Sequence, residues 1–175
     1  MTNTLNNSEN KHNKLIREQR GYTPKDLLPS LKKYCSFPVP DNFDPDEISW
    51  VLPRLGVTNL TGAYAAKDNG NFLINTAEEI HSPADLKQIV DHYDGPESVK
   101  KNLDIIATVI DQVLSQTDQN VVVHCYMGME RSVLSIVWYL HTFQGFTIDE
   151  AYQKVGEVRP IAIDHRSWVL GESVN

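Results

Sequence analysis

One short segment of the chain combines residue types that together can carry out phosphoryl chemistry. Cys125 follows the run Val121 to Val123 and His124, and Arg131 comes six residues later, directly before Ser132. A cysteine thiolate is a strong nucleophile, and the planar guanidinium of an arginine can bind two phosphoryl oxygens at once. A serine hydroxyl can donate a hydrogen bond to the sulfur and help it to depart. We therefore predict Cys125 as the nucleophile, Arg131 as the phosphate clamp and Ser132 as a catalytic hydroxyl.

The elements on either side of this segment place it where anions bind. The β-branched run Val121 to Val123 predicts a strand buried on both faces, and residues 131 to 144 are apolar nearly all round, which predicts a central helix. Backbone amides that curl at a helix N-terminus form an anion cradle, and a glycine allows the tight curl. We expect His124 to orient the loop rather than to act as a base. The predicted phosphate-binding residues are Tyr126, Met127, Gly128, Met129, Glu130 and Arg131.

The rest of the chain alternates strand and helix signals. Thr23-Pro24 predicts the start of a short helix that runs through Leu31 to Tyr34. Short apolar runs predict strands at 50 to 53, 56 to 60 and 71 to 75. An apolar stripe from Val99 to Val113 predicts a long helix from about Pro96, and a capping box at Thr147 opens another toward Val155. These elements together predict an α/β fold with a central sheet.

The segment from His124 to Ser132 resembles the signature of the protein tyrosine phosphatase superfamily, and Gly128 matches its dual-specificity branch. The resemblance extends more loosely over residues 48 to 170. It implies a mixed, mostly parallel sheet flanked by helices. It also implies a cysteine-dependent protein phosphatase that works without a cofactor or a metal, through a phosphocysteine intermediate. The implied partner is a phosphorylated protein, with phosphotyrosine as the main substrate, and phosphoserine and phosphothreonine in addition if the pocket is shallow.

Members of this superfamily need an aspartic acid that protonates the leaving oxygen, on a mobile loop about thirty residues before the cysteine. Asp91 and Asp94 are both candidates. We prefer Asp94, because Gly95-Pro96 follows it, and keep Asp91 as the alternative. Asp164 or Arg166 could in addition line the rim of the pocket, as the matching segment does in some relatives.

The chain departs from several relatives in ways that narrow its function. Met127, Met129 and the acidic Glu130 replace the basic residues with which lipid phosphatases meet additional phosphates. Two alternatives stay open beside a protein phosphatase. One is a phosphoprotein-binding module with weak catalysis or none, and the other is a phosphatase for a small metabolite or an RNA 5′ end.

Composition and charge set the remaining expectations. A chain of 175 residues favours one domain, over 21 to 175, after a disordered tail at 1 to 20 that has few apolar residues. The net charge of −7 argues against a nucleic-acid partner. The lack of a long apolar stretch argues against a membrane partner, and two cysteines far apart, Cys35 and Cys125, argue against a disulfide framework. We therefore expect a cytoplasmic protein of undetermined oligomeric state.

Overall fold

The sheet places its most buried strand at its centre. In this computed structural model, which describes residues 10–171, five strands pair in the order β1-β2-β5-β3-β4. β1 (Ser49–Leu52) runs antiparallel to β2 (Leu55–Thr58), while β5 (Val121–His124), β3 (Phe72–Asn75) and β4 (Leu86–Lys87) continue the sheet in parallel. The predicted mixed, mostly parallel sheet is therefore confirmed.

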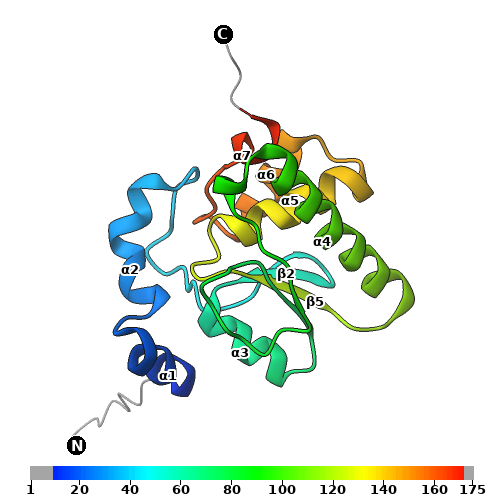
Figure 1. The fold of residues 1–175 in the computed structure, drawn as a ribbon. Helices are drawn as coiled ribbons and strands as arrows, with labels where there is room; N and C mark the ends of the chain where they lie inside the picture. The colour runs from blue at the N-terminus through cyan, green and yellow to red at the C-terminus, as the bar shows by residue number, and fades with distance from the viewer. Residues whose placement is uncertain (1–9, 172–175) are drawn as a thin grey trace, which may run out of the picture.

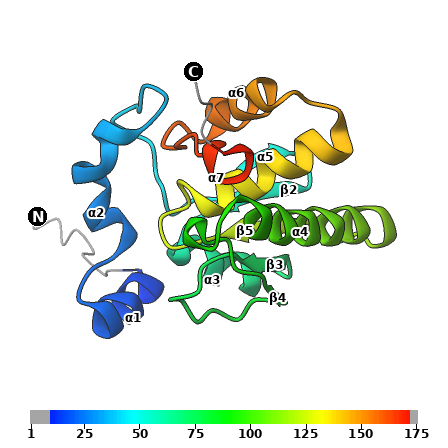
Figure 2. The same cartoon turned by 45° about the horizontal axis from the view of Figure 1, so that its top comes forward.

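Helices cover both faces of the sheet, as Figures 1 and 2 show. One face carries α3 (Leu60–Asp68), and the other carries α4 (Pro96–Gln116), α5 (Arg131–Gln144) and α6 (Ile148–Val158), with the short α7 (Ser167–Leu170) against α4. Successive side chains of a strand point to opposite faces. Val121 and Val123 accordingly pack with α4 and α5, and Val122 packs with α3. Within the described residues, no helix is both long enough and apolar enough to cross a membrane.

The central position of α5 follows from its sequence. All of its residues from Ser132 to Leu140 are buried. The α4 helix instead buries one stripe, which includes Val99, Leu103 and Ile106. Both arrangements agree with the periodicity of the sequence, and the strand candidates became β1, β2 and β3. The α3 helix was not predicted, because its alanines and glycine leave it only a weak apolar pattern.

The expected disordered tail is wrong over residues 11–20, which form the helix α1 (Lys11–Arg20); residues 1–9 lie outside the described residues. Ile16 is 1% exposed and packs beside the loop of Cys125. Polar contacts provide the other anchors: the Thr61 hydroxyl donates to the Asn13 side chain at 2.7 Å, and Arg17 pairs with Asp26 at 2.5 Å. The error arose because the expectation counted apolar residues and gave no weight to such pairs.

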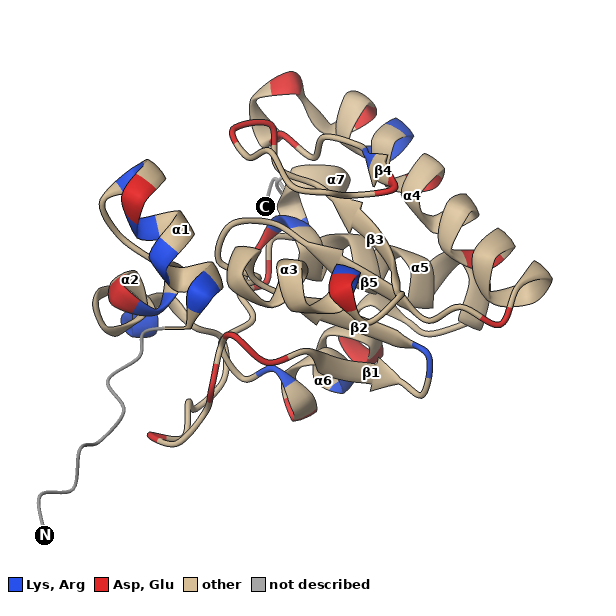
Figure 3. Ribbon diagram, turned by 90° about the horizontal axis from the view of Figure 1, so that it is seen from below, with Lys and Arg blue, Asp and Glu red and all other residues tan. Residues whose placement is uncertain are grey.

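After α1, the chain continues as predicted into α2 (Pro24–Leu31), whose cap is Thr23. Both helices lie beside the end of the sheet that bears the Cys125 loop (Figure 1). Figure 3 shows that several of the basic residues lie on these two helices, although the chain as a whole is acidic.

Candidate active site

The loop from Cys125 to Arg131 lies at the carboxyl end of the central strand β5. The neighbouring strands β3 and β4 run parallel to β5, so the loops that follow them start at the same edge of the sheet. Ligands of α/β proteins bind at this edge. Here the β3–β4 loop supplies Thr76, Glu79 and Ser82, and the segment after β4 supplies Asp91.

Every carbonyl of the loop is bound by a donor that lies outside the loop's concave side. Arg159, which follows α6, is fully buried and donates to two of these carbonyls. The carbonyl of His124 accepts from Thr76, that of Cys125 from His124 Nδ1, that of Tyr126 from the Leu60 amide, those of Met127 and Gly128 from Arg159, and that of Met129 from the Ile163 amide.

A peptide whose carbonyl is fixed outward turns its amide inward, because the peptide unit is planar. Among the described residues, no protein group accepts a hydrogen bond from the amides of Tyr126, Met127, Met129 or Glu130. Gly128 makes the turn possible with φ of +67°, and its amide donates to the Cys125 sulfur at 3.3 Å. The loop is therefore a ring of free donors around the thiol.

The surroundings of Cys125 favour its thiolate. The side chain is 2% exposed. Burial alone raises the pKa of the Cys125 thiol, but the charge of Arg131 and hydrogen bonds from Ser132 and Gly128 outweigh it, so the pKa is lowered overall. The Ser132 hydroxyl lies 3.1 Å from the sulfur. This contact places the Ser132 hydroxyl within hydrogen-bond distance of the sulfur, as the sequence analysis expected.

His124 is held as a neutral ring behind the loop. Its Nδ1 lies 3.0 Å from the Cys125 carbonyl, which can only accept, so this nitrogen carries the proton and Nε2 accepts from the Ser82 hydroxyl at 2.9 Å. Burial is the main reason why the pKa of His124 is lowered to about 4. A ring that is neutral and doubly bound in this way orients the loop and is a poor candidate for a general base.

Arg131 leaves the start of α5 and forms a bidentate pair with Glu79, with both N–O distances at 2.7 Å. Burial lowers the pKa of Arg131, but the bonds to Glu79 and the charge of Cys125 raise it further, so the guanidinium remains charged. The hydrogen bonds from Arg131 also lower the pKa of Glu79. Arg20 of α1 donates to the Glu79 carbonyl, so α1 helps to fix this partner of the predicted clamp.

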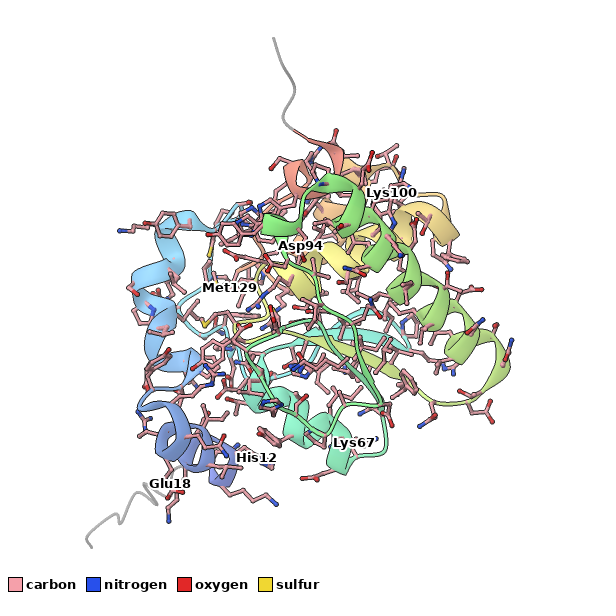
Figure 4. All side chains as sticks on the ribbon, in the orientation of Figure 1. His12, Glu18, Lys67, Asp94, Lys100 and Met129 are labelled. Atoms are coloured by element: carbon pink, nitrogen blue, oxygen red, sulfur yellow. The ribbon has the colours of Figure 1, made fainter. Side chains whose placement is uncertain are left out.

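A cavity of about 170 Å³ leads to the sulfur of Cys125. Its lining is mostly apolar. Two of the lining residues, Leu31 and Tyr34, come from the N-terminal part of the chain. The other lining residues are Met127, Met129, Glu130, Arg131 and Ile163. Figure 4 shows Met129 between α2 and the end of the sheet. A larger hollow of about 630 Å³ lies on the outer face of α4, between Glu97 and Val109, and contains no thiol.

A second cavity, of about 250 Å³, adjoins the first, and Glu130 and Arg131 line both. Asp91 lines this second cavity, and its carboxylate accepts from the Tyr93 amide at 3.0 Å. Asp94 is exposed and lines neither cavity; it lies just before α4 (Figure 4). The geometry thus favours Asp91 over the preferred Asp94, because only Asp91 of the two lines a cavity together with Arg131.

Several residues of the site were missed by sequence reasoning. Arg159 is 0% exposed, Glu79 pairs with Arg131, and Trp168 lines the second cavity. Asp164 and Arg166, which the sequence analysis considered for the rim of the pocket, pair with each other at 2.7 Å. The residues of that segment that line the cavities are Ile163 and Trp168. An arginine and an aromatic residue near a helix end are too common to have singled out these positions.

Comparisons with known proteins agree with this geometry. The family model described as "Dual specificity phosphatase, catalytic domain" matches residues 58–169. The chain is 29% identical over 112 residues to the dual specificity protein phosphatase 26 of Rattus norvegicus and of Mus musculus, which is 63% of this chain and 50% of each relative. The chain therefore spans about half the length of the curated relatives that it matches.

Solved structures show the same fold. Human DUSP28 is 22% identical and superimposes with a TM-score of 0.62, over 78% of this chain and 93% of that chain. A mouse putative dual specificity phosphatase complexed with zinc tungstate is 22% identical, with a TM-score of 0.60 over 78% of this chain and 89% of that chain. The human tyrosine phosphatase-like serine/threonine/tyrosine-interacting protein is 19% identical, with a TM-score of 0.61 over 72% of this chain and 93% of that chain.

The chain belongs to the dual specificity phosphatase family, within the protein tyrosine phosphatase superfamily. The resemblance drawn from the segment between His124 and Ser132 is thereby confirmed. The matched range begins at the end of β2 and ends in α7, so α1 and α2 lie outside it although they contribute to the site.

Proposed function

We propose that this protein is a cysteine-dependent phosphatase that hydrolyses phosphotyrosine in protein substrates through a phosphocysteine intermediate. The observation that carries the proposal is the ring of inward amides around a buried thiol of lowered pKa, with Arg131 beside it. Such donors stabilise the thiolate before the substrate arrives and the charge of the phosphoryl group as it is transferred.

The reaction runs in two steps. The thiolate of Cys125 attacks phosphorus, and the bond from phosphorus to the tyrosyl oxygen breaks while Asp91 gives its proton to that oxygen. Water then attacks the phosphocysteine and loses a proton to Asp91, and the sulfur leaves as a thiolate with a hydrogen bond from Ser132. Inorganic phosphate is released, and Cys125 and Asp91 return to their starting states.

The assignment of the general acid to Asp91 is supported by the second cavity, which this residue lines together with Arg131. The choice can be tested with Asp91→Asn and Asp94→Asn and two esters. Phenyl phosphate needs a proton on its leaving oxygen, whereas 2,4-dinitrophenyl phosphate does not. Asp91→Asn should lose about a hundredfold or more in kcat/KM on phenyl phosphate alone, and Asp94→Asn should lose little. The reverse result would restore Asp94.

Phosphotyrosine is the favoured substrate because the cavity above Cys125 is walled mainly by apolar side chains, among them Leu31, Met127 and Ile163. An aromatic ring buries apolar area against such walls, whereas the short side chain of phosphoserine cannot. The relevant measurement is kcat/KM for one peptide sequence that carries phosphotyrosine, phosphothreonine or phosphoserine at the same position. Equal values for the three would argue against this preference.

The first experiment is hydrolysis of para-nitrophenyl phosphate in the presence of EDTA, by the wild type and by Cys125→Ser and Arg131→Lys. EDTA-resistant turnover that both substitutions abolish would support the thiol mechanism. Tungstate binding, measured by calorimetry, is the matched second readout, because this tetrahedral anion should bind in the amide ring. Binding without turnover would favour a phosphoprotein-binding module, and the absence of both would refute the proposed site.

A further inference from the structure

A stack of three rings joins the C-terminal segment to the segment that carries Asp91. The indole ring of Trp168 lies between two histidine rings, with a centroid distance of 4.5 Å to His92 and 3.9 Å to His165. Both pairs are nearly parallel, with interplanar angles of 14°. Parallel aromatic pairs at these distances attract each other beyond the area that they bury.

The two ends of the stack reach the two parts of the site. His92 directly follows Asp91 in the chain. At the other end, His165 Nε2 lies 3.4 Å from the carboxylate of Glu130, which belongs to the Cys125 loop. Trp168 and Asp91 also line the same cavity beside Arg131. The stack therefore bridges the acid segment and the phosphate-binding loop.

The two sides of this bridge are anchored to different extents. On the Trp168 side, Val169 is buried in the main core, and the His165 amide donates to the Tyr152 hydroxyl at 3.0 Å. On the Asp91 side, Val90 is buried in the main core, but residues 92–94 are exposed, and within the described residues their side chains make no hydrogen bond. Beyond Asp91, ring stacking on His92 is therefore the main side-chain contact that holds the acid segment in place.

We propose that Trp168 is a positioning residue that, by stacking on His92, holds Asp91 beside Arg131 and so controls the protonation of the leaving group. The proposal rests on the phosphatase activity proposed above and goes beyond it. Trp168 touches neither the phosphoryl group nor Cys125 in this scheme, so attack by the thiolate does not depend on it. Its removal should slow only the reactions in which the departing oxygen needs a proton.

The expected loss follows from the strength of the stack. The contribution of one aromatic pair corresponds to a change of roughly twofold to tenfold in a rate constant. Trp168→Ala should therefore lower kcat/KM for phenyl phosphate by up to about tenfold. The kcat/KM for 2,4-dinitrophenyl phosphate, which needs no general acid, should stay within about twofold of the wild-type value. Trp168→Phe keeps a ring in place and should retain most of the activity on both esters.

Two further variants keep the test independent of folding defects. His92→Ala removes the other half of the stack at an exposed position, so it should fold normally and reproduce the selective loss. Trp50→Ala removes a partly exposed tryptophan from β1, at the opposite edge of the sheet, and should leave the ratio of the two esters unchanged. The substrate ratio is the decisive readout, because a general loss of folded protein lowers both rates equally.

The outcomes separate this inference from the proposed function. If Asp91→Asn shows the selective loss while Trp168→Ala and His92→Ala do not, the positioning role is refuted and the phosphatase mechanism stands. An equal decrease on both esters in His92→Ala would also refute the positioning role. If the wild type hydrolyses neither ester, the proposed function fails and the positioning role fails with it.

Discussion

Ser132→Ala tests how the loop lowers the pKa of the nucleophile. The Cys125 sulfur accepts hydrogen bonds from the Ser132 hydroxyl at 3.1 Å and from the Gly128 amide at 3.3 Å. A hydrogen bond to a charged group contributes about 1.5–3 kcal/mol, and one pKa unit corresponds to about 1.36 kcal/mol. Because the Gly128 amide and Arg131 remain, we take the lower end of this range. Ser132→Ala should raise the pKa of the Cys125 thiol by about one unit.

The pKa can be measured from the rate of alkylation by iodoacetamide as a function of pH. A Cys35→Ser background removes the second thiol, whose pKa is raised by burial. Ser135→Ala is the matched control, because Ser135 is buried on the same helix but its hydroxyl donates to the Arg131 carbonyl at 2.8 Å and not to sulfur. In the pH profile of turnover, the acid limb should move to higher pH together with the thiol pKa, in Ser132→Ala but not in Ser135→Ala. An unshifted alkylation curve in Ser132→Ala, or an equal shift in Ser135→Ala, would refute the reasoning.

Three further predictions concern stability. Burial lowers the pKa of His124 to about 4, below its unfolded value of 6.5, so stability that is present above pH 6.5 is lost as the pH falls. Between about pH 7.5 and about pH 5 the free energy of unfolding should fall by about 2 kcal/mol for this reason. In His124→Asn, urea unfolding should no longer show this pH-dependent decrease. Gly128→Ala would place its Cβ 2.5 Å from Arg159 and 2.6 Å from the Thr58 carbonyl. This substitution should abolish turnover and lower the free energy of unfolding by about 2 kcal/mol or more. Ile16→Ala should lower the free energy of unfolding by about 2–4 kcal/mol.

Two of these predictions, those for Gly128→Ala and Ile16→Ala, have a matched control within the chain. Gly145 has a positive φ of +76°, as Gly128 has, but a Cβ at this position would meet nothing within 4 Å. Gly145→Ala should therefore lower the free energy of unfolding by only about 1 kcal/mol and leave turnover intact. Leu15→Ala lies beside Ile16 on α1 but is 39% exposed, and it should cost about 0.5 kcal/mol or less. Equal losses within either pair would contradict the packing argument. If the pH dependence of unfolding is the same in His124→Asn as in the wild type, the buried neutral ring is excluded as its source.

The parts of the site that could be predicted from the sequence are those whose residues are contiguous. Cys125, Gly128, Arg131 and Ser132 lie within one strand-loop-helix unit, whose periodicity fixes where each side chain begins. The fold class was predictable for the same reason, because β5 and the helices on either side of it have strong apolar patterns. Local pattern was therefore sufficient to place the predicted nucleophile and the predicted clamp in one loop at the end of β5.

The partners of that unit come from distant segments, and local pattern says little about them. Arg159 is a charged residue at a helix end, where exposure is the ordinary expectation, yet it is fully buried because two loop carbonyls and the Ser49 hydroxyl accept its hydrogen bonds. Asp91 and Asp94 differ by three positions, and the one local signal, Gly95-Pro96, favours Asp94. The distinction depends on which of them lines the cavity beside Arg131, which is a tertiary property.

The two chemical tasks of the site rest on different kinds of support. The phosphate-binding loop is fixed at each carbonyl from His124 to Met129 by hydrogen bonds from several segments, so its donors need no rearrangement when charge develops. Residues 92–94, which follow Asp91, are exposed, and their side chains are held mainly by the ring contacts of His92. Phosphate binding and attack by the thiolate should therefore tolerate mild destabilisation, while protonation of the leaving group fails first. On this reasoning, low concentrations of urea should slow the hydrolysis of phenyl phosphate before that of 2,4-dinitrophenyl phosphate.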